Sequence, residues 1–163
     1  MYIVITQCFA SKVGGIESLM TNLALAIAKT NEVKVFADQH FYVQDAIFDS
    51  DNESIIKIFR YGGIKYFRRR KKARDIKLYI ENKDIKGVIA DTWKSLELCI
   101  KEIKNKNIPV ICLAHGNELL YNEKYRKDRI TNTLSKVDKI VANSKFTSKL
   151  IEKLGLNKNN ICV

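Results

Sequence analysis

The sequence predicts an α/β fold with a doubly wound, mostly parallel sheet of about seven strands. Short apolar runs alternate along the chain with longer runs of helical period, which is typical of βαβ crossovers. The apolar runs are nearly continuous, so both faces of each strand are expected to be buried. No internal repeat and no low-complexity linker interrupts the pattern. We therefore expect one domain over residues 1–163.

The expected elements follow the chain in order. The first strand is the β-branched run from Tyr2 to Thr6, and a helix follows from Ile16 to Lys29. The apolar face of this helix is formed by residues at helical spacing: Ile16, Leu19, Met20, Leu23, Ala24 and Ile27. Further strands are expected at residues 33–37, 54–59, 88–90, 109–114, 139–142 and 160–163. Further helices are expected at residues 64–82, 93–105, 123–136 and 146–154, with Leu96, Cys99, Ile100 and Ile103 on one stripe.

Composition indicates a globular protein. The 163 residues are 46% hydrophobic and include one proline, which suits a single buried core. The four cysteines form no CxxC pair and are expected to be reduced thiols. The chain begins on a strand without the charged segment of a signal peptide, and no apolar run is long enough to span a bilayer. We therefore expect a soluble, cytoplasmic protein that can touch the inner face of the cell membrane.

The chain stops inside an apolar run, Ile161-Cys-Val163. This ending leads us to expect a fragment, with a second domain following it.

Ligands bind beyond the carboxyl ends of the strands in an open parallel sheet. Four loops at this edge carry residues with chemical use: Gly14 and Gly15, then Asp91, Thr92 and Trp93, then His115, Gly116, Asn117 and Glu118, then Asn143, Ser144 and Lys145. We expect these loops to converge on one cleft, with Asp91 and Thr92 as candidate acceptor or cleft residues.

Gly14 and Gly15 lie in a turn between a strand and a helix, where backbone N–H groups can hold an anion. Asp38 follows at about the spacing of a ribose-binding acid in dinucleotide-binding proteins. The GxGxxG fingerprint is absent, however, and seven residues separate Thr6 from Gly14, too many for the tight turn of that motif. A dinucleotide-binding oxidoreductase is therefore disfavoured.

His115 comes directly after an apolar strand and is followed by a glycine, an asparagine and Glu118. A titratable ring beside a close-approach glycine and a carboxylate favours a functional site over a core histidine. His40 has no such neighbouring residues and is assigned no role. Ser144 fits the N-cap of the last long helix as well as it fits a ligand contact. Lys145 in the first turn opposes the helix dipole, which favours an anionic ligand there.

Three motifs stand in order along the chain: Gly14-Gly-Ile-Glu17, His115-Gly-Asn-Glu118, and Val141 to Ser148 leading through Gly155 to Val163. Together they resemble the N-terminal domain of a family 4 glycosyltransferase of the GT-B fold. The likeness covers the whole chain and is weakest over residues 38–85. It implies a Rossmann-like half of a two-domain enzyme. The donor-binding domain would be absent from this chain, which alone is expected to be inactive.

The resemblance implies retaining transfer of a sugar from a nucleotide-sugar to a glycan or lipid-linked acceptor, in cell-surface polysaccharide or glycolipid synthesis. It assigns His115 to catalysis near the transferred sugar, and places Gly14 and Gly15 near the donor diphosphate. Further donor or substrate contacts are expected from Glu17, Asn117, Glu118, Ser144 and Lys145. No metal and no other cofactor is expected.

Residues 57–77 contain ten basic residues and one acid, so they hold +9 of the net charge of +11. The five consecutive cations at 68–72 point in every direction around a helix, so that turn cannot pack flat. A solvated helix end is the plain interpretation. The alternative is a contact with an anionic membrane, in which each cation contributes about 1 kcal/mol. Its residues would be Tyr66, Phe67, Arg68, Arg69, Arg70, Lys71 and Lys72.

Nucleic acid is the rival partner for a basic patch with aromatic residues. No nucleic-acid-binding motif accompanies the patch, so this partner is disfavoured. The alternative for the whole chain is a stand-alone α/β module that binds a nucleotide or nucleic acid without transferase activity.

Overall fold

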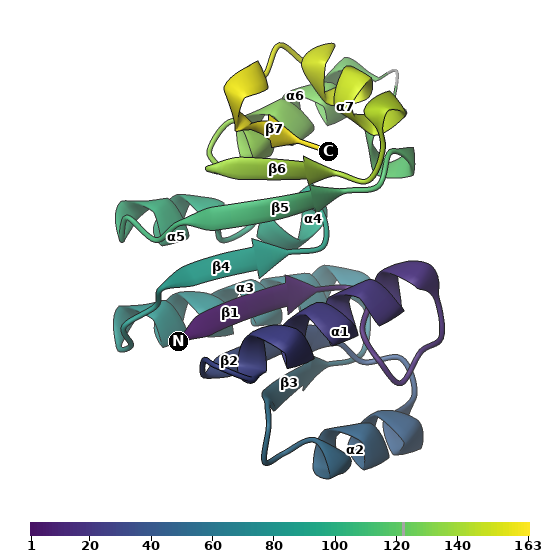
Figure 1. Ribbon diagram of the computed structural model, residues 1–163, viewed down its shortest axis with the longest axis vertical. Helices are drawn as coiled ribbons and strands as arrows, with labels where there is room; N and C mark the ends of the chain where they lie inside the picture. Colours follow the sequence, from purple (N-terminus) through teal and green to yellow (C-terminus); the bar gives the residue numbers. More distant parts are fainter. Residues whose placement is uncertain (122) are drawn as a thin grey trace.

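The computed structural model describes residues 1–121 and 123–163. Within them, seven strands form one sheet in the order β3-β2-β1-β4-β5-β6-β7, and each neighbouring pair is parallel (Figure 1). The strands are β1 (Tyr2–Thr6), β2 (Val33–Asp38), β3 (Lys57–Tyr61), β4 (Gly87–Ala90), β5 (Val110–Ala114), β6 (Lys139–Ala142) and β7 (Ile161–Cys162). The predicted doubly wound parallel sheet is confirmed.

Helices cover both faces of this sheet. They are α1 (Gly15–Ala28), α2 (Tyr42–Asp51), α3 (Lys65–Glu81), α4 (Trp93–Leu96), α5 (Ile100–Asn105), α6 (Lys124–Leu134) and α7 (Lys145–Glu152), with 3₁₀ turns η1 (Asn117–Leu119) and η2 (Lys158–Asn160). Figure 1 shows α1 in front of the sheet and α3 behind it.

Two hydrophobic cores fill the space between the layers. Successive strand residues point to opposite faces, so Val4 of β1 packs with Met20 and Ala24 of α1, whereas Ile3 and Ile5 belong to the core on the other face. All are completely buried. The fold therefore leaves the carboxyl ends of the strands as the edge where loops can form a site.

Three elements differ from the sequence prediction. Helix α2 is not predicted, because its apolar side chains Tyr42, Val43 and Ile47 are exposed and form no buried stripe. Strand β3 starts three residues later than expected, since the turn that ends α2 continues through Ile55 and Ile56, whose N–H groups donate to Asn52. The expected helix over residues 93–105 is divided into α4 and α5.

The α1 stripe is also rotated from its expected position. Leu19 is 47% exposed, whereas Glu17 and Thr21 are buried on the inner face. The hydroxyl of Thr21 accepts a hydrogen bond from Ala10 N at 3.1 Å, which explains why a polar residue lies there.

In the described part of the chain, no helix combines the length and the apolar character needed to cross a bilayer. The four cysteines, Cys8, Cys99, Cys112 and Cys162, are free thiols, as predicted.

Candidate active site

Strands β1, β4, β5 and β6 are neighbours in the sheet, so the loops that follow them meet at one edge. Two of these loops are described below by fixed names. The first loop is residues 7–14, after β1, and the His115 loop is residues 115–118, after β5. The sheet order brings the predicted site residues to the same edge, and their surroundings differ sharply.

The imidazole of His115 is anchored to the neighbouring strand end. Its Nε2 lies 3.0 Å from the main-chain oxygen of Asp91, and its main-chain N donates to Glu118 Oε1 at 2.7 Å. A carbonyl oxygen only accepts, so Nε2 carries the proton of this bond and Nδ1 is the acceptor in the neutral ring. The side chain is half-buried, which suits a group that meets a substrate at the surface of a cleft.

Gly116 lets this loop approach α7 closely. Its φ is +100°, a conformation that side chains rarely adopt, and a Cβ here would lie 2.9 Å from Thr147 Oγ1. Thr147 in turn donates to Asn143 Oδ1 at 2.7 Å, and Asn143 Nδ2 donates to His115 O at 3.3 Å. The His115 loop is thus locked to the beginning of α7 by uncharged contacts.

Ser144 is the N-cap of α7, as one of the two interpretations predicted. Its hydroxyl accepts from Thr147 N at 3.2 Å. Lys145 and Asn117 are exposed, and their expected substrate contacts stay predictions. The contact of Ser144 with a ligand stays a prediction too, because a cap does not exclude it.

The glycine turn before α1 is partly filled by the protein itself. A Cβ on Gly14 would overlap Glu17 Oε2, so this glycine makes room for a side chain of its own helix. Gly15 has nothing within 4 Å of a Cβ and is open. Glu17 is 6% exposed and pairs with Lys12 Nζ at 2.9 Å. Burial raises the pKa of Glu17, but the hydrogen bond and charge of Lys12 outweigh it and hold the pKa below its usual value.

The carboxylate of Asp91 does not line a cleft, which corrects the sequence prediction. It is fully buried and accepts from Thr6 Oγ1 at 2.9 Å, Gln7 N at 2.7 Å and Ser95 Oγ at 2.6 Å. Burial raises its pKa above the usual value. Asp91 therefore joins the end of β1 to α4, and only its main-chain oxygen reaches His115. Within the described residues, the buried Thr92 Oγ1 has no hydrogen-bond partner, so Thr92 keeps its place as a candidate.

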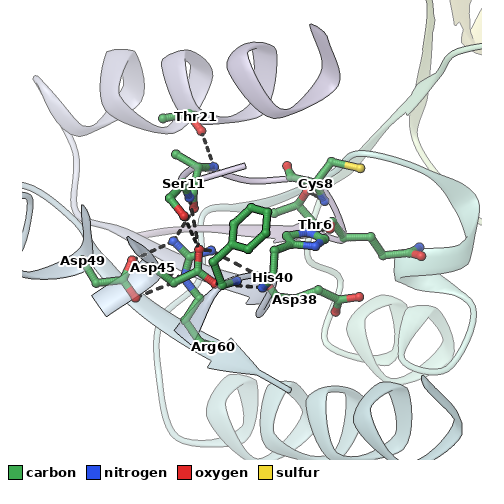
Figure 2. A network of polar contacts seen from close by, with 12 residues as sticks. Thr6, Cys8, Ser11, Thr21, Asp38, His40, Asp45, Asp49 and Arg60 are labelled. Carbon is green, nitrogen blue, oxygen red and sulfur yellow. Dashed lines mark hydrogen bonds and ion pairs between the residues drawn. The ribbon is translucent and has the colours of Figure 1, made fainter. Parts of the chain in front are cut away.

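A charge network that the sequence analysis missed shapes the first loop (Figure 2). Asp45 of α2 is 1% exposed and accepts from Ser11 N, Ser11 Oγ, His40 N and Phe41 N at 2.8–3.2 Å. Burial raises the pKa of Asp45, but these donors outweigh it and the pKa lies below its usual value. Asp45 joins two loops, because His40 and Phe41 lie directly before α2 whereas Ser11 lies 34 residues earlier in the first loop.

Arg60 and His40 complete this network. Arg60 of β3 pairs with Asp49 at 2.7 Å and donates to the main-chain oxygen of Ala10. His40 Nε2 lies 2.8 Å from Gln7 O, so the histidine without an assigned role holds the first loop in place. Figure 2 shows these side chains gathered beneath the loop.

The basic stretch on α3 is divided between interior and surface. Lys72 is 4% exposed and binds Asp38 Oδ1 at 2.5 Å, so its predicted membrane contact is wrong. Arg68 also turns inward, with Nε 3.0 Å from Asp38 Oδ2. Arg69 pairs with Glu97 at 2.7 Å. The helical period of α3 places each of these three cations beside an acid from another element. The exposed members of the stretch are Tyr66, Phe67, Arg70 and Lys71.

Comparison with known families shows to which family the chain belongs. The family model described as Glycosyltransferase Family 4 matches residues 13–163, which include every motif at the carboxyl edge. The chain belongs to glycosyltransferase family 4. No curated protein sequence matches it.

Solved structures show how widely the family 4 domain's fold occurs. The chain is similar to the lipopolysaccharide outer core galactosyltransferase WaaB in its apo form, with a TM-score of 0.68 and 17% identity over 100% of this chain and 45% of that one. Anabaena Alr3699/HepE in complex with UDP and glucose gives a TM-score of 0.72 and 14% identity over 100% and 43%. The UDP-GlcNAc 2-epimerase from Methanocaldococcus jannaschii gives 0.69 and 14% over 100% and 45%.

The family 4 chain therefore spans less than half the length of these structures. At such low identity the likeness is one of fold, and transferases and epimerases share it. The Rossmann-like fold expected for a GT-B glycosyltransferase is confirmed.

Proposed function

We propose that this family 4 domain forms the acceptor side of a retaining glycosyltransferase, which moves a sugar from a nucleotide-sugar to a glycan or lipid-linked acceptor. The arrangement of His115 carries the proposal. Its ring contacts the main-chain oxygen of Asp91, directly after β4, and Gly116 lets its loop pack closely against Thr147 of α7, at the edge where such sheets bind ligands. A ring fixed this way is positioned to contact the transferred sugar.

The donor would approach from the side of α1. Gly15 leaves open space above the first turn of this helix, where N–H groups favour an anion. We propose that the donor diphosphate lies there, held by these dipoles and by nearby cations without a metal ion. A second, donor-binding domain would complete the site, and this chain alone would be inactive. The UDP and UDP-glucose complexes of the similar Alr3699/HepE support a nucleotide-sugar as donor class.

The decisive experiment replaces His115 in the transferase that contains this chain. His115→Ala should lower kcat at least about 100-fold, within the range of a positioned acid–base or electrostatic group, while the thermal unfolding midpoint changes little. His115→Gln, which keeps a donor toward Asp91 O, separates loop geometry from ring chemistry. Near-normal turnover of His115→Ala would remove this residue from the mechanism. Incubation with EDTA should leave the rate unchanged.

The stereochemical part of the proposal has its own test. NMR of the first product formed should show the anomeric configuration of the donor. An inverted product would overturn retaining transfer and leave the rest of the proposal standing.

We also propose that the exposed beginning of α3 touches an anionic membrane at the inner face of the cell, in cell-surface polysaccharide or glycolipid synthesis. Ile64, Tyr66 and Phe67 are 72%, 56% and 66% exposed. Arg70 lies 3.5 Å from the centroid of the Tyr66 ring, which combines an aromatic anchor with a cation.

Vesicle sedimentation tests this surface. Vesicles containing phosphatidylglycerol should pull the protein down at low salt, and Phe67→Ser with Arg70→Ala should abolish the effect. Lys106→Ala, on an exposed residue at the end of α5, is the matched control. Binding of single-stranded DNA without binding of vesicles would contradict the membrane proposal.

A further inference from the structure

A hollow of about 260 Å³ opens beside the candidate active site. Its cationic side chains come from helices α3, α4 and α6: Lys65, Arg69, Lys94, Arg126 and Arg129. Its aromatic side chains are Trp93 and Tyr121. We refer to this hollow as the cationic pocket. None of the residues assigned to catalysis or to the donor lines it.

The charges of the cationic pocket are not balanced within the protein. Glu97 binds both Arg69 and Arg129, at 2.7 Å and 2.6 Å, and Glu123 binds Arg126 at 2.9 Å. Among the salt bridges of the described residues, none involves Lys65 or Lys94. Five cations against two carboxylates leave a surplus of three positive charges around one hollow. Such a surplus favours an anionic occupant.

The aromatic side chains of the cationic pocket indicate an organic anion rather than a bare inorganic ion. Lys94 Nζ donates to the Tyr121 hydroxyl at 3.2 Å, and the Arg126 guanidinium lies 4.5 Å from the centroid of the Tyr121 ring. The hydrogen bond and charge of Lys94 lower the pKa of Tyr121. An aromatic face between cations suits a phosphate carried by a ring such as a sugar. The ring can lie on the aromatic surface while the phosphate binds the cations.

The cationic pocket is joined to the candidate active site. Trp93 Nε1 donates to Glu118 O at 3.3 Å, and the carboxylate of the same Glu118 accepts from His115 N. On its other side, Lys65 is the first residue of α3, directly before the exposed Tyr66 and Phe67. The pocket therefore lies between the loop proposed for catalysis and the surface proposed to touch lipid.

We propose that the cationic pocket binds the phosphate or diphosphate of the acceptor, which is either a phosphorylated sugar or the head group of a phosphorylated lipid. The proposal rests on the proposed transferase function and names its acceptor class. The hollow is slightly smaller than a typical ligand site of about 300–1,000 Å³, so it accommodates a head group while the rest of the acceptor stays outside.

Trp93 is the sole tryptophan of the chain and reports on the pocket directly. Its fluorescence should change saturably when the chain is titrated with pyrophosphate or glucose 1-phosphate at constant ionic strength, and should not change with glucose. Lys94→Met and Arg126→Ala should each weaken binding about tenfold or more, because each removes a charged contact to the phosphate. Lys106→Ala, with an equal loss of charge near the amino end of β5, should change it less than about twofold.

A second arm separates the two sources of phosphate. Vesicles with phosphatidic acid in phosphatidylcholine should reproduce the Lys94-dependent fluorescence change if a lipid head group is bound. A response to glucose 1-phosphate alone identifies a soluble acceptor and equally supports the pocket. The absence of any saturable response, an equal loss in Lys106→Ala, or a response only to single-stranded DNA would overturn the proposal.

The titration needs neither donor nor turnover. Failure of the transferase proposal therefore leaves a positive titration intact, and a negative titration beside normal His115-dependent transfer removes only the cationic pocket. Thermal unfolding of each variant confirms that it is folded.

Discussion

The first loop and the His115 loop lie at the same edge of the sheet but are held in opposite ways. The first loop is fixed by buried charges, chiefly Asp45 and Arg60, whose partners are all within the protein. The His115 loop is joined to its neighbours by uncharged bonds to Asn143 and to the main chain of Asp91, and within the loop the carboxylate of Glu118 accepts from His115 N. The charges beside the first loop are paired with one another. Beside the His115 loop, the cationic pocket keeps an excess of positive charge.

The largest effect is expected where the internal charges are broken. Asp45→Ala removes the buried acceptor of four partly buried donors, so it should lower the free energy of unfolding by about 3–5 kcal/mol. Urea denaturation measures this loss. Asp128→Ala, on an exposed side chain of α6, should change stability by less than about 0.5 kcal/mol. A similar small change in both variants would mean that the network does not hold the first loop.

A comparison of two glycine substitutions tests how the His115 loop is held. Gly116→Ala combines a positive φ with a contact of 2.9 Å to Thr147 Oγ1, so it should cost about 1–3 kcal/mol and displace His115. Gly15→Ala meets open space and should change stability by less than about 0.5 kcal/mol. If the donor diphosphate approaches Gly15, the same substitution still raises KM for the donor. Equal stability loss in the two variants would contradict the assigned geometry.

The two buried carboxylates should give opposite pH dependences. The folded-state pKa of Asp45 is lowered, so its contribution is complete above the unfolded value of about 3.9 and is lost as pH falls through the folded value. The pKa of Asp91 is raised, so the folded protein binds the proton more tightly and this contribution weakens as pH rises from the unfolded to the folded value.

Urea midpoints measured across this acidic range check both signs. Asp45→Asn should flatten the loss of stability toward low pH, and Asp91→Asn should remove a decline toward higher pH. Two changes of the same sign would show that the assigned environments are wrong.

Much of the fold could be predicted because its signals are local. The strands at residues 2–6 and 139–142 are apolar runs, and Ser144 is a polar residue placed before a helical stripe. Helix α2 gave no such signal, because its apolar residues Tyr42 and Val43 are exposed and its buried residue is the charged Asp45.

The site was predictable only as positions along the chain. The order of the strands brought His115 and Thr92 to one edge, as the alternating pattern implied. Lys72 was assigned to the surface because its partner Asp38 lies 34 residues earlier, on β2. Pairing across that distance is set by the packing of α3 on the sheet, which composition and periodicity do not specify.

The smallest effect sharpens the comparison at α7. Ser144→Ala removes one cap and should lower stability by about 1 kcal/mol, whereas Ser144→Asn should restore most of it because asparagine caps helices equally well. Transfer by the Ser144→Asn variant then separates the two interpretations of this residue. Activity that returns with the cap makes Ser144 a structural residue. Activity that stays low in a stable protein makes it a ligand contact, and extends the ligand-facing side of the edge from the His115 loop to α7.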